Sequence, residues 1–341
     1  MRLLLSLLSA TALFAQAPAS GPDAAVLGRL LDRHKPQASA AYDFAAIGDQ
    51  QYGPAGEAKW PALAQHINRS GVAFVLHAGD VKSGDTLCSN EMFANRVASF
   101  NALEMPMIIT PGDNEWTDCH RENNGSYDSL ERLDHLRRMF YPDNQSLGRR
   151  KMTLSLQSED ARYSRYRENS LFSMGNILYA AVHVVGSNNN IGRNAANDRE
   201  YEERTAANFN WLKTVFAVAR DNNFAGVVLL MQANPGMSGA RVPVAALGTG
   251  FRDTFFVIED ETIVFNRPVL LIFGDSHVFR IDKPLLGARS NQVIENLQRL
   301  EVPGSGDAHW VRVKVNPAKP GSPFSFEHED VPENRVAQQR P

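Results

Sequence analysis

Four apolar segments of this chain are each followed by a glycine and an aspartate, and this pattern constrains the fold more than any other feature. The segments are 44–47, 72–78, 105–109 and 269–273, and the aspartates are Asp49, Asp80, Asp113 and Asp275. Short apolar runs of this kind predict buried strands. If the strands are neighbours in one parallel arrangement, their carboxyl ends share an edge and the four carboxylates crowd together. Crowded carboxylates raise one another's pKa unless a cation lies between them, so the sequence predicts a cation site at a sheet edge.

The first third of the chain alternates predicted strands with predicted helices. Strands are expected at 42–48, 72–78 and 105–109, with helical patterns at 58–70 and 90–103 between them. This order is typical of a parallel, buried sheet with right-handed crossovers. Further strands are expected at 171–174, 177–185, 226–231, 269–273, 293–302 and 309–315, and further helices at 129–140 and 202–220. The chain is therefore an α/β protein.

The N-terminus has the layout of a secretory signal peptide. Arg2 precedes a short apolar run, and the small residues Ala15, Ala17 and Ala19 follow it. This arrangement predicts export with cleavage after Ala19, and therefore a periplasmic or extracellular protein. The alternative is an uncleaved membrane anchor, but the apolar run is short for a membrane span. We expect no membrane span after signal cleavage.

The rest of the chain divides into an arm, a domain and a tail. Residues 20–41 are expected to form a linker or N-terminal arm, 42–316 the domain, and 317–341 a loose C-terminal tail. Within the domain, 116–167 interrupts the strand pattern and is expected to be an insertion over the site face. Its nine arginines would either attract an anionic substrate or form a solvated face balanced by acids, and we favour the second. The formal net charge of −3 gives no evident nucleic-acid surface.

Two cysteines, Cys88 and Cys119, each follow one of the Gly-Asp strand ends. An even cysteine count in an exported protein favours a disulfide. A bridge here would close a loop of about thirty residues, worth roughly 3–4 kcal/mol in the chain-entropy model. The alternative is a pair of free thiols.

The order of the strand-end motifs resembles that of the calcineurin-like metallophosphoesterase superfamily. That family carries, in sequence order, D-x-H, G-D, G-N-H-D/E, a lone histidine after a strand, and G-H-x-H. The matching stretches here are Asp49-Gln50-Gln51, Gly79-Asp80, Gly112-Asp113-Asn114-Glu115, Gln232 and Gly274-Asp275-Ser276-His277. The resemblance covers about residues 42–315 and is to a divergent, histidine-poor branch. It implies a four-layer α/β/β/α sandwich with two metal ions at its strand ends.

Carried over residue by residue, the resemblance implies two metal sites that share Asp80. The first would be formed by Asp49, Gln51, Asp80 and His277, and the second by Asp80, Asp113, Gln232 and Asp275. Oxygen ligands replace imidazoles in this set, which suits Mg²⁺, Mn²⁺ or Ca²⁺ better than Zn²⁺. Glutamine is a weak ligand, so one site is expected to be empty or to fill only with substrate. The alternative is that the aspartates cap helices and loops around a site without metal.

The resemblance implies hydrolysis of a phosphate mono- or diester by a metal-activated water. Asn114 stands where the family has its catalytic histidine, and it can donate a hydrogen bond but not a proton. His120 is a candidate replacement, and a surface-loop histidine is the alternative reading.

Two functions are therefore compared. The first is an exported metal-dependent phosphoesterase acting on a phosphorylated small molecule or ester. The second is a catalytically impaired relative that serves as a metal-binding or interaction protein. A dinucleotide-binding protein is disfavoured, because no G-x-G-x-x-G follows the first strand.

Overall fold

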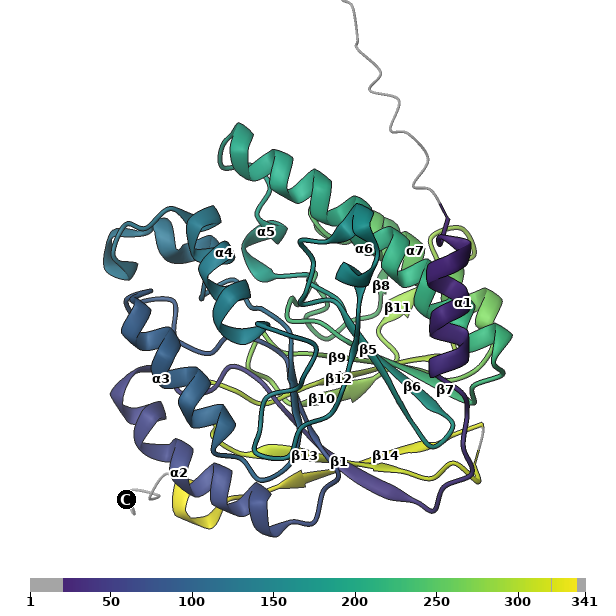
Figure 1. The fold of residues 1–341 in the computed structure, drawn as a ribbon, viewed down its shortest axis with the longest axis horizontal. Helices are drawn as coiled ribbons and strands as arrows, with labels where there is room; N and C mark the ends of the chain where they lie inside the picture. The colour runs from purple at the N-terminus through teal and green to yellow at the C-terminus, as the bar shows by residue number, and fades with distance from the viewer. Residues whose placement is uncertain (1–20, 320, 336–341) are drawn as a thin grey trace, which may run out of the picture.

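The computed structural model describes residues 21–319 and 321–335, so the predicted signal peptide at 1–19 lies outside the described residues. Two large β-sheets form the centre of the described chain (Figure 1). The first has the strand order β14 (Phe324–Glu329), β13 (Trp310–Val315), β1 (Tyr42–Ile47), β2 (Val75–His77) and β3 (Met107–Ile109). The second has the order β10 (Arg280–Asp282), β12 (Leu297–Glu301), β9 (Val269–Phe273), β7 (Gly226–Leu230), β6 (Ile177–Ala181), β5 (Ser170–Met174) and β4 (Ser155–Leu156). A small separate pair joins β11 (Leu285–Leu286) to β8 (Val242–Pro243).

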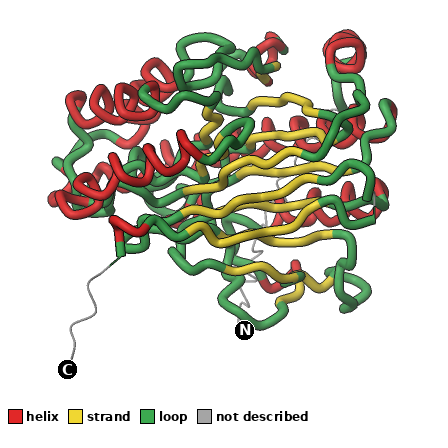
Figure 2. The backbone as a smooth tube through the Cα atoms, turned by 90° about the horizontal axis from the view of Figure 1, so that it is seen from below, coloured by secondary structure: helices red, strands yellow, loops and turns green. Residues whose placement is uncertain are grey.

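The helices lie outside the two sheets, as the red and yellow tube of Figure 2 shows. They are α1 (Ala24–Arg33), α2 (Gly53–Arg69), α3 (Asn90–Asn101), α4 (Ser129–Phe140), α5 (Gly186–Asn189), α6 (Ala195–Asp221) and α7 (Arg252–Phe265). Helices α2, α3 and α4 share an apolar cluster with the first sheet, and α1, α6 and α7 share one with the second. A third cluster lies between the sheets. The predicted four-layer α/β/β/α sandwich is thus confirmed.

Alternation along β1 explains how one strand serves two layers. Phe44 and Ala46 belong to the cluster between the sheets, whereas Ala45 and Ile47 face the helical cluster. Side chains of a strand point to opposite faces in turn, so a strand buried on both faces must be apolar throughout. Burial on both faces is the reason why these segments have the apolar pattern of buried strands.

Parallel pairing brings the strand ends together. β1 pairs with β2, and β2 with β3, both in parallel. In the second sheet β6, β7, β9 and β12 are parallel neighbours. The loops that leave β1, β2 and β3 therefore lie at one edge of the first sheet, and those that leave β7 and β9 at one edge of the second.

Several expectations about the elements need correction. Helix α1, in the segment expected to be a linker or N-terminal arm, packs on the domain, because Leu30 is buried in the same apolar cluster as α6 and α7. The tail after residue 316 is not wholly loose, because β14 pairs with β13 in antiparallel register. Helix α6 begins at Ala195, earlier than the predicted 202, since the Asn194 side chain accepts hydrogen bonds from the first-turn amides. Helix α7 lies in a region for which no helix was expected.

Within the described part of the chain, no helix combines the length and the apolar character needed to cross a membrane.

Candidate metal centre

The residues at the strand ends adopt a backbone conformation that most side chains avoid. Asp49, Asp80, Asp275 and His277 have φ angles of 52°, 57°, 74° and 62°. Left-handed backbone of this kind is uncommon outside glycine, although aspartate tolerates it better than most residues. Such strain persists where the surrounding structure imposes it, and it is concentrated at functional sites. Here the left-handed backbone turns the chain at the aspartates that follow the strands.

Glycines make room for these carboxylates. A Cβ on Gly112 would lie 2.0 Å from Asp80 Oδ1, and a Cβ on Gly274 would lie 2.0 Å from Asp49 Oδ2. The glycine at one strand end is therefore packed against the aspartate of another. This close approach explains why glycine and aspartate occur together at these strand ends.

Three of the four aspartates converge on one point. Oxygen atoms of Asp80, Asp113 and Asp275 lie within 4.8 Å of one another. Asp80 and Asp113 come from the first sheet, and Asp275 from the second. These three are the aspartates of the second metal site that the family resemblance implies.

The electrostatics of the cluster favour a cation. Burial, together with Asp113 and the other nearby carboxylates, raises the pKa of Asp80 well above its usual range. Burial also raises the pKa of Asp113 to about 8 and that of Asp275 to about 6, with neighbouring carboxylates adding to both effects. Three such groups cannot all ionise near neutral pH without a positive charge between them. An all-oxygen donor set of this kind fits a hard divalent cation.

Gln232 lies beside the three aspartates and presents its nitrogen to them. Its Nε2 donates to Asp80 Oδ2 at 3.2 Å and to Asp113 Oδ1 at 3.3 Å. Its Oε1 accepts from the backbone N–H of Gly186 at 2.6 Å. The amide oxygen is thus already engaged. In this arrangement Gln232 stabilises the carboxylates by donating hydrogen bonds and does not offer them an oxygen ligand.

Asp49 is fully buried beside the cluster and has partners of its own. Its carboxylate accepts from the backbone N–H of Asp275 at 3.1 Å, and His277 Nε2 lies 3.4 Å from Asp49 Oδ1. Burial raises the pKa of Asp49, and the hydrogen bond from His277 opposes that effect. Burial lowers the pKa of His277, but Asp49 more than compensates, so the net shift is upward. Asp49 and His277 therefore form a hydrogen-bonded pair next to the cluster.

Asn114 points toward the centre. Its Nδ2 donates to Asp80 Oδ2 at 2.9 Å and to the Tyr52 hydroxyl at 3.0 Å. Glu115, the next residue, accepts from the backbone N–H groups of Gly112, Asp80 and Val81. Glu115 therefore fixes the loops after β2 and β3 to each other, while Asn114 contacts the carboxylate of Asp80.

Two of the predicted site residues do not join the cluster. The side chain of Gln51 donates to Ser99 Oγ of α3 at 3.1 Å, and no hydrogen bond links it to the aspartates. Left-handed backbone at Gln51 turns it from Asp49 toward that helix. His120 ends a short 3₁₀ helix (Thr117–His120), where its side chain is exposed and its Nδ1 lies 2.8 Å from the Thr117 carbonyl.

Three residues near the centre were missed in the sequence. The Tyr52 hydroxyl lies 2.9 Å from Asp80 Oδ2 and 3.3 Å from Asp49 Oδ1, and can donate to either. Ser187 Oγ lies 2.8 Å from Asp113 Oδ2 and 2.7 Å from Asp118 Oδ1, which joins buried Asp118 to the centre. Tyr52 could have been suspected from its place just after Asp49-Gln50-Gln51. Ser187 and Asp118 carry no sequence signal, because their roles depend on how loops of the two sheets meet.

The disulfide expected from the cysteine count is confirmed. Cys88 and Cys119 are bonded, with their Cα atoms 5.8 Å apart. Their Sγ atoms lie 3.6 and 3.7 Å from the carbonyl oxygen of Asn114. The bridge therefore packs against the loop that carries Asp113 and Asn114.

Comparison with known proteins gives a consistent picture. A family model described as calcineurin-like phosphoesterase matches residues 42–279. The solved structure of PhoD is similar over 87% of this chain and 72% of its own, with 13% identity and a TM-score of 0.53. A dimetal phosphatase from Danio rerio matches 86% of this chain and 100% of its own, with 13% identity and a TM-score of 0.48. The protein titled GAP50, the anchor in the inner membrane complex of Plasmodium, matches 86% of this chain and 89% of its own, with 10% identity and a TM-score of 0.48. Among curated proteins no sequence matches this chain.

Proposed function

The chain belongs to the calcineurin-like phosphoesterase family, and on this basis we propose that it is an exported phosphoesterase that hydrolyses a phosphate mono- or diester. Family membership itself supports a metal-dependent phosphoesterase with a phosphate-ester substrate. The export, the ester class and the residue roles are our proposals.

The observation that carries the proposal is the convergence of Asp80, Asp113 and Asp275 within 4.8 Å. We assign these three carboxylates as ligands of one divalent ion. Mg²⁺, Mn²⁺ and Ca²⁺ fit best, because the donors are oxygen atoms and no imidazole is among them. Asp49 and His277 would contribute to a second ion, for which Gln51 is poorly placed and the Tyr52 hydroxyl competes. We therefore expect the first ion to bind more tightly than the second.

When bound, divalent ions supply Lewis-acid activation of the ester and of the attacking water. The side chains provide the remaining functions. Asn114 Nδ2 is directed at Asp80, so it can donate a hydrogen bond to a phosphoryl oxygen beside that carboxylate. It cannot protonate a leaving group. His120 has no hydrogen bond to the cluster among the described residues, so its proposed role as an acid depends on movement of its 3₁₀ helix.

Export is supported by the disulfide, because such bonds persist mainly in oxidising compartments. The layout of residues 1–19 points the same way. We expect the intact mass of the mature protein to correspond to a chain that begins at Ser20. A mass that includes the first nineteen residues would contradict this part of the proposal.

A second candidate function is a metal-binding relative without hydrolase activity. It is favoured by one observation, which is that Gln232 and Asn114 place amide nitrogens against Asp80 where the family has histidines. This candidate predicts metal uptake at the three aspartates but no turnover.

The test is hydrolysis of p-nitrophenyl phosphate and bis(p-nitrophenyl) phosphate by chelator-treated mature protein, with Mg²⁺, Mn²⁺ or Ca²⁺ added back singly. We expect metal-dependent turnover that Asp113→Asn reduces by roughly 100-fold or more, since it removes a ligand charge. Asp260→Asn, at an exposed position of α7, is the matched control and should behave as the parent.

Calorimetry with the same ions separates the two candidates. Metal uptake without turnover would favour the binding protein, whereas neither uptake nor turnover would exclude both.

A further inference from the structure

Two arginines stand beside the metal centre on the side of Asp113. Arg121 Nη2 lies 2.9 Å from Asp118 Oδ2, and Asp118 is joined through Ser187 to Asp113. The Arg121 side chain is 44% exposed, so its guanidinium lies at the surface of the centre. Its Nη1 would lie 3.5 Å from a Cβ on Gly84, and Asn114 Oδ1 would lie 3.1 Å from the same point. Arg121 therefore reaches the neighbourhood of both Asp113 and Asn114.

Arg193 approaches from the other sheet, in the loop that precedes α6. Its Nη1 donates to Ser129 Oγ at 2.9 Å, and Ser129 in turn donates to the Thr117 carbonyl. Thr117 Oγ1 donates to the backbone carbonyl of Asp113 at 3.1 Å. Burial lowers the pKa of Arg193, and the charges that act on it are Asp118, Arg121 and Asp113. These contacts place the half-buried guanidinium beside the cluster.

Arg193 differs from the buried arginines of α4 in having no acidic partner. Arg137 pairs with Glu168 at 2.6 Å, and Arg132 pairs with Glu131 at 2.5 Å. No carboxylate of the described residues lies within ion-pair distance of Arg193. An arginine carries five N–H donors in a fixed planar fork, and one neutral hydroxyl satisfies few of them. A half-buried guanidinium with donors that lack acceptors is suited to bind an anionic ligand.

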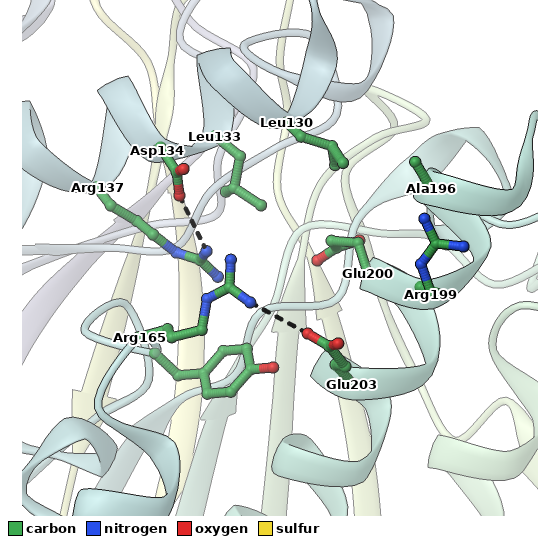
Figure 3. Close-up of a pocket in the computed structure, with 10 residues that line it drawn as sticks. Leu130, Leu133, Asp134, Arg137, Arg165, Ala196, Arg199, Glu200 and Glu203 are labelled. Carbon is green, nitrogen blue, oxygen red and sulfur yellow. Dashed lines mark hydrogen bonds and ion pairs between the residues drawn. The ribbon is translucent and has the colours of Figure 1, made fainter.

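The cavity between α4 and α6 does not offer the same chemistry (Figure 3). It holds about 200 Å³, and two of its three arginines, Arg137 and Arg165, already have acidic partners, whereas the third, Arg199, is exposed on α6. Figure 3 shows Arg137 paired with Asp134 and Arg165 paired with Glu203. A half-buried guanidinium without an acidic partner among the described residues therefore lies at Arg193, beside the metal centre, next to Arg121, whose charge is shared with Asp118.

We propose that Arg121 and Arg193 bind a second anionic group of the substrate, a carboxylate or another phosphate next to the phosphoryl group at the metal centre. The inference rests on the proposed function, because it takes the metal centre as the position of the phosphoryl group. Asp118 orients Arg121 from behind and leaves its second amino group open, while Arg193 contributes donors that lack partners. The substrate class is thus a small phosphate ester with a further negative charge near the ester bond.

The experiment compares 3-phosphoglycerate with glycerol 3-phosphate, which differ in that a carboxylate replaces a hydroxymethyl group. Metal-loaded mature protein is assayed by release of inorganic phosphate, as the parent and as Arg193→Met, Arg121→Met and Arg193→Lys. The parent should prefer 3-phosphoglycerate. Arg193→Met should raise its KM for that ester by about tenfold or more, the loss expected for a charge-assisted hydrogen bond. The KM for glycerol 3-phosphate should change little, and Arg193→Lys should recover part of the preference. Arg199→Met, at an exposed arginine of α6 that lines the cavity of Figure 3, is the matched control and should behave as the parent.

Each outcome decides the inference. The inference would be overturned if Arg193→Met raised the KM for both esters equally. It would also be overturned if the preference for 3-phosphoglycerate survived in Arg193→Met and Arg121→Met. If the parent hydrolyses neither ester, the p-nitrophenyl ester assay still decides the proposed function, and the anion site is tested by calorimetry on the metal-loaded protein. Tighter binding of 3-phosphoglycerate that Arg193→Met abolishes would then support the site, and equal binding of the two esters would overturn it. Denaturant unfolding of each variant shows whether it is folded.

Discussion

Asp113 is the residue at which the charge of the centre is least balanced. It is almost fully buried, and its neighbours include Asp118, Asp275 and Glu115 as well as Asp80. Among the described residues, only the Ser187 hydroxyl and the Gln232 amide donate hydrogen bonds to its side chain. Neutral donors offset part of this repulsion but cannot remove it. The remainder requires either bound protons or a bound cation.

This balance predicts an unusual pH dependence for metal-free protein. The pKa of Asp113 is raised to about 8, against about 3.9 in an unfolded chain, so the native state holds a proton that the unfolded state lacks between these values. The stabilisation is complete below about pH 4 and is lost as the pH rises through about 8. Chelator-treated protein should therefore lose on the order of 1–2 kcal/mol of unfolding free energy between about pH 6.5 and 8. Urea unfolding titrations at about pH 6.5 and about pH 8 measure this loss of unfolding free energy.

The pH window and one variant make the measurement specific to Asp113. Buried His34 and His183, whose pKa values are lowered to about 4, destabilise the protein only as the pH falls below about 6.5, outside the chosen window. Asp113→Asn should remove much of the slope, because asparagine does not titrate. An unchanged slope in Asp113→Asn would contradict the assignment of the pH dependence to this group.

At the scale of elements, strands were easier to predict than helix ends. β1, β9 and β13 lie close to their expected positions, because buried strands must be continuously apolar or alternate regularly. The first turns of α6 are polar and acquire their helical state from the Asn194 cap, which a search for apolar periodicity does not detect. β14 was missed because it lies at the edge of the sheet, paired only with β13, and its exposed residues Ser325, Glu327 and His328 are polar. Local sequence therefore predicts the buried strands, whereas helix ends and edge strands depend on caps and pairing partners.

The disulfide connects two elements of the centre, and its removal should affect both stability and metal binding. It joins the start of α3 to the 3₁₀ helix after β3 and contacts the carbonyl of Asn114. The variant Cys88→Ala/Cys119→Ala should lose about 3–4 kcal/mol of unfolding free energy from the freed chain entropy. Its metal affinity should fall as well, because the loop that holds Asp113 gains freedom.

Denaturant titration and calorimetry of the double variant measure the two effects. Parent protein treated with a thiol reductant is the comparison, and it should resemble the variant. Stability that falls while metal affinity stays unchanged would show that the loop of Asp113 does not depend on the bridge.

At the scale of the whole molecule, the candidate centre is assembled from both sheets. The positions of Asp49, Asp80, Asp113 and Asp275 could be predicted because each comes within about four residues of the end of its own strand. Gln51 has left-handed backbone and its side chain donates to Ser99 of α3, so its role as a ligand stays a prediction. The contact between Ser187 and Asp113 could not be predicted, since it depends on the distance and angle between two sheets that no local pattern encodes. Sequence thus located the carboxylates but not the groups that orient them.

An ion held by Asp80, Asp113 and Asp275 would connect the two sheets. The unfolding free energy should therefore differ between the metal-bound and the metal-free protein. With metal at 100 times its dissociation constant, the parent should gain about 2.7 kcal/mol of unfolding free energy. Asp275→Asn removes the carboxylate that the second sheet contributes, so most of this gain should disappear. Without metal the same variant should be as stable as the parent or more stable, because it relieves repulsion among buried carboxylates. Urea unfolding with metal and with chelator measures both effects, and Asp260→Asn should leave both unchanged. An equal loss of stability in the two conditions would mean that Asp275 supports the fold alone and that the ion does not join the sheets through it.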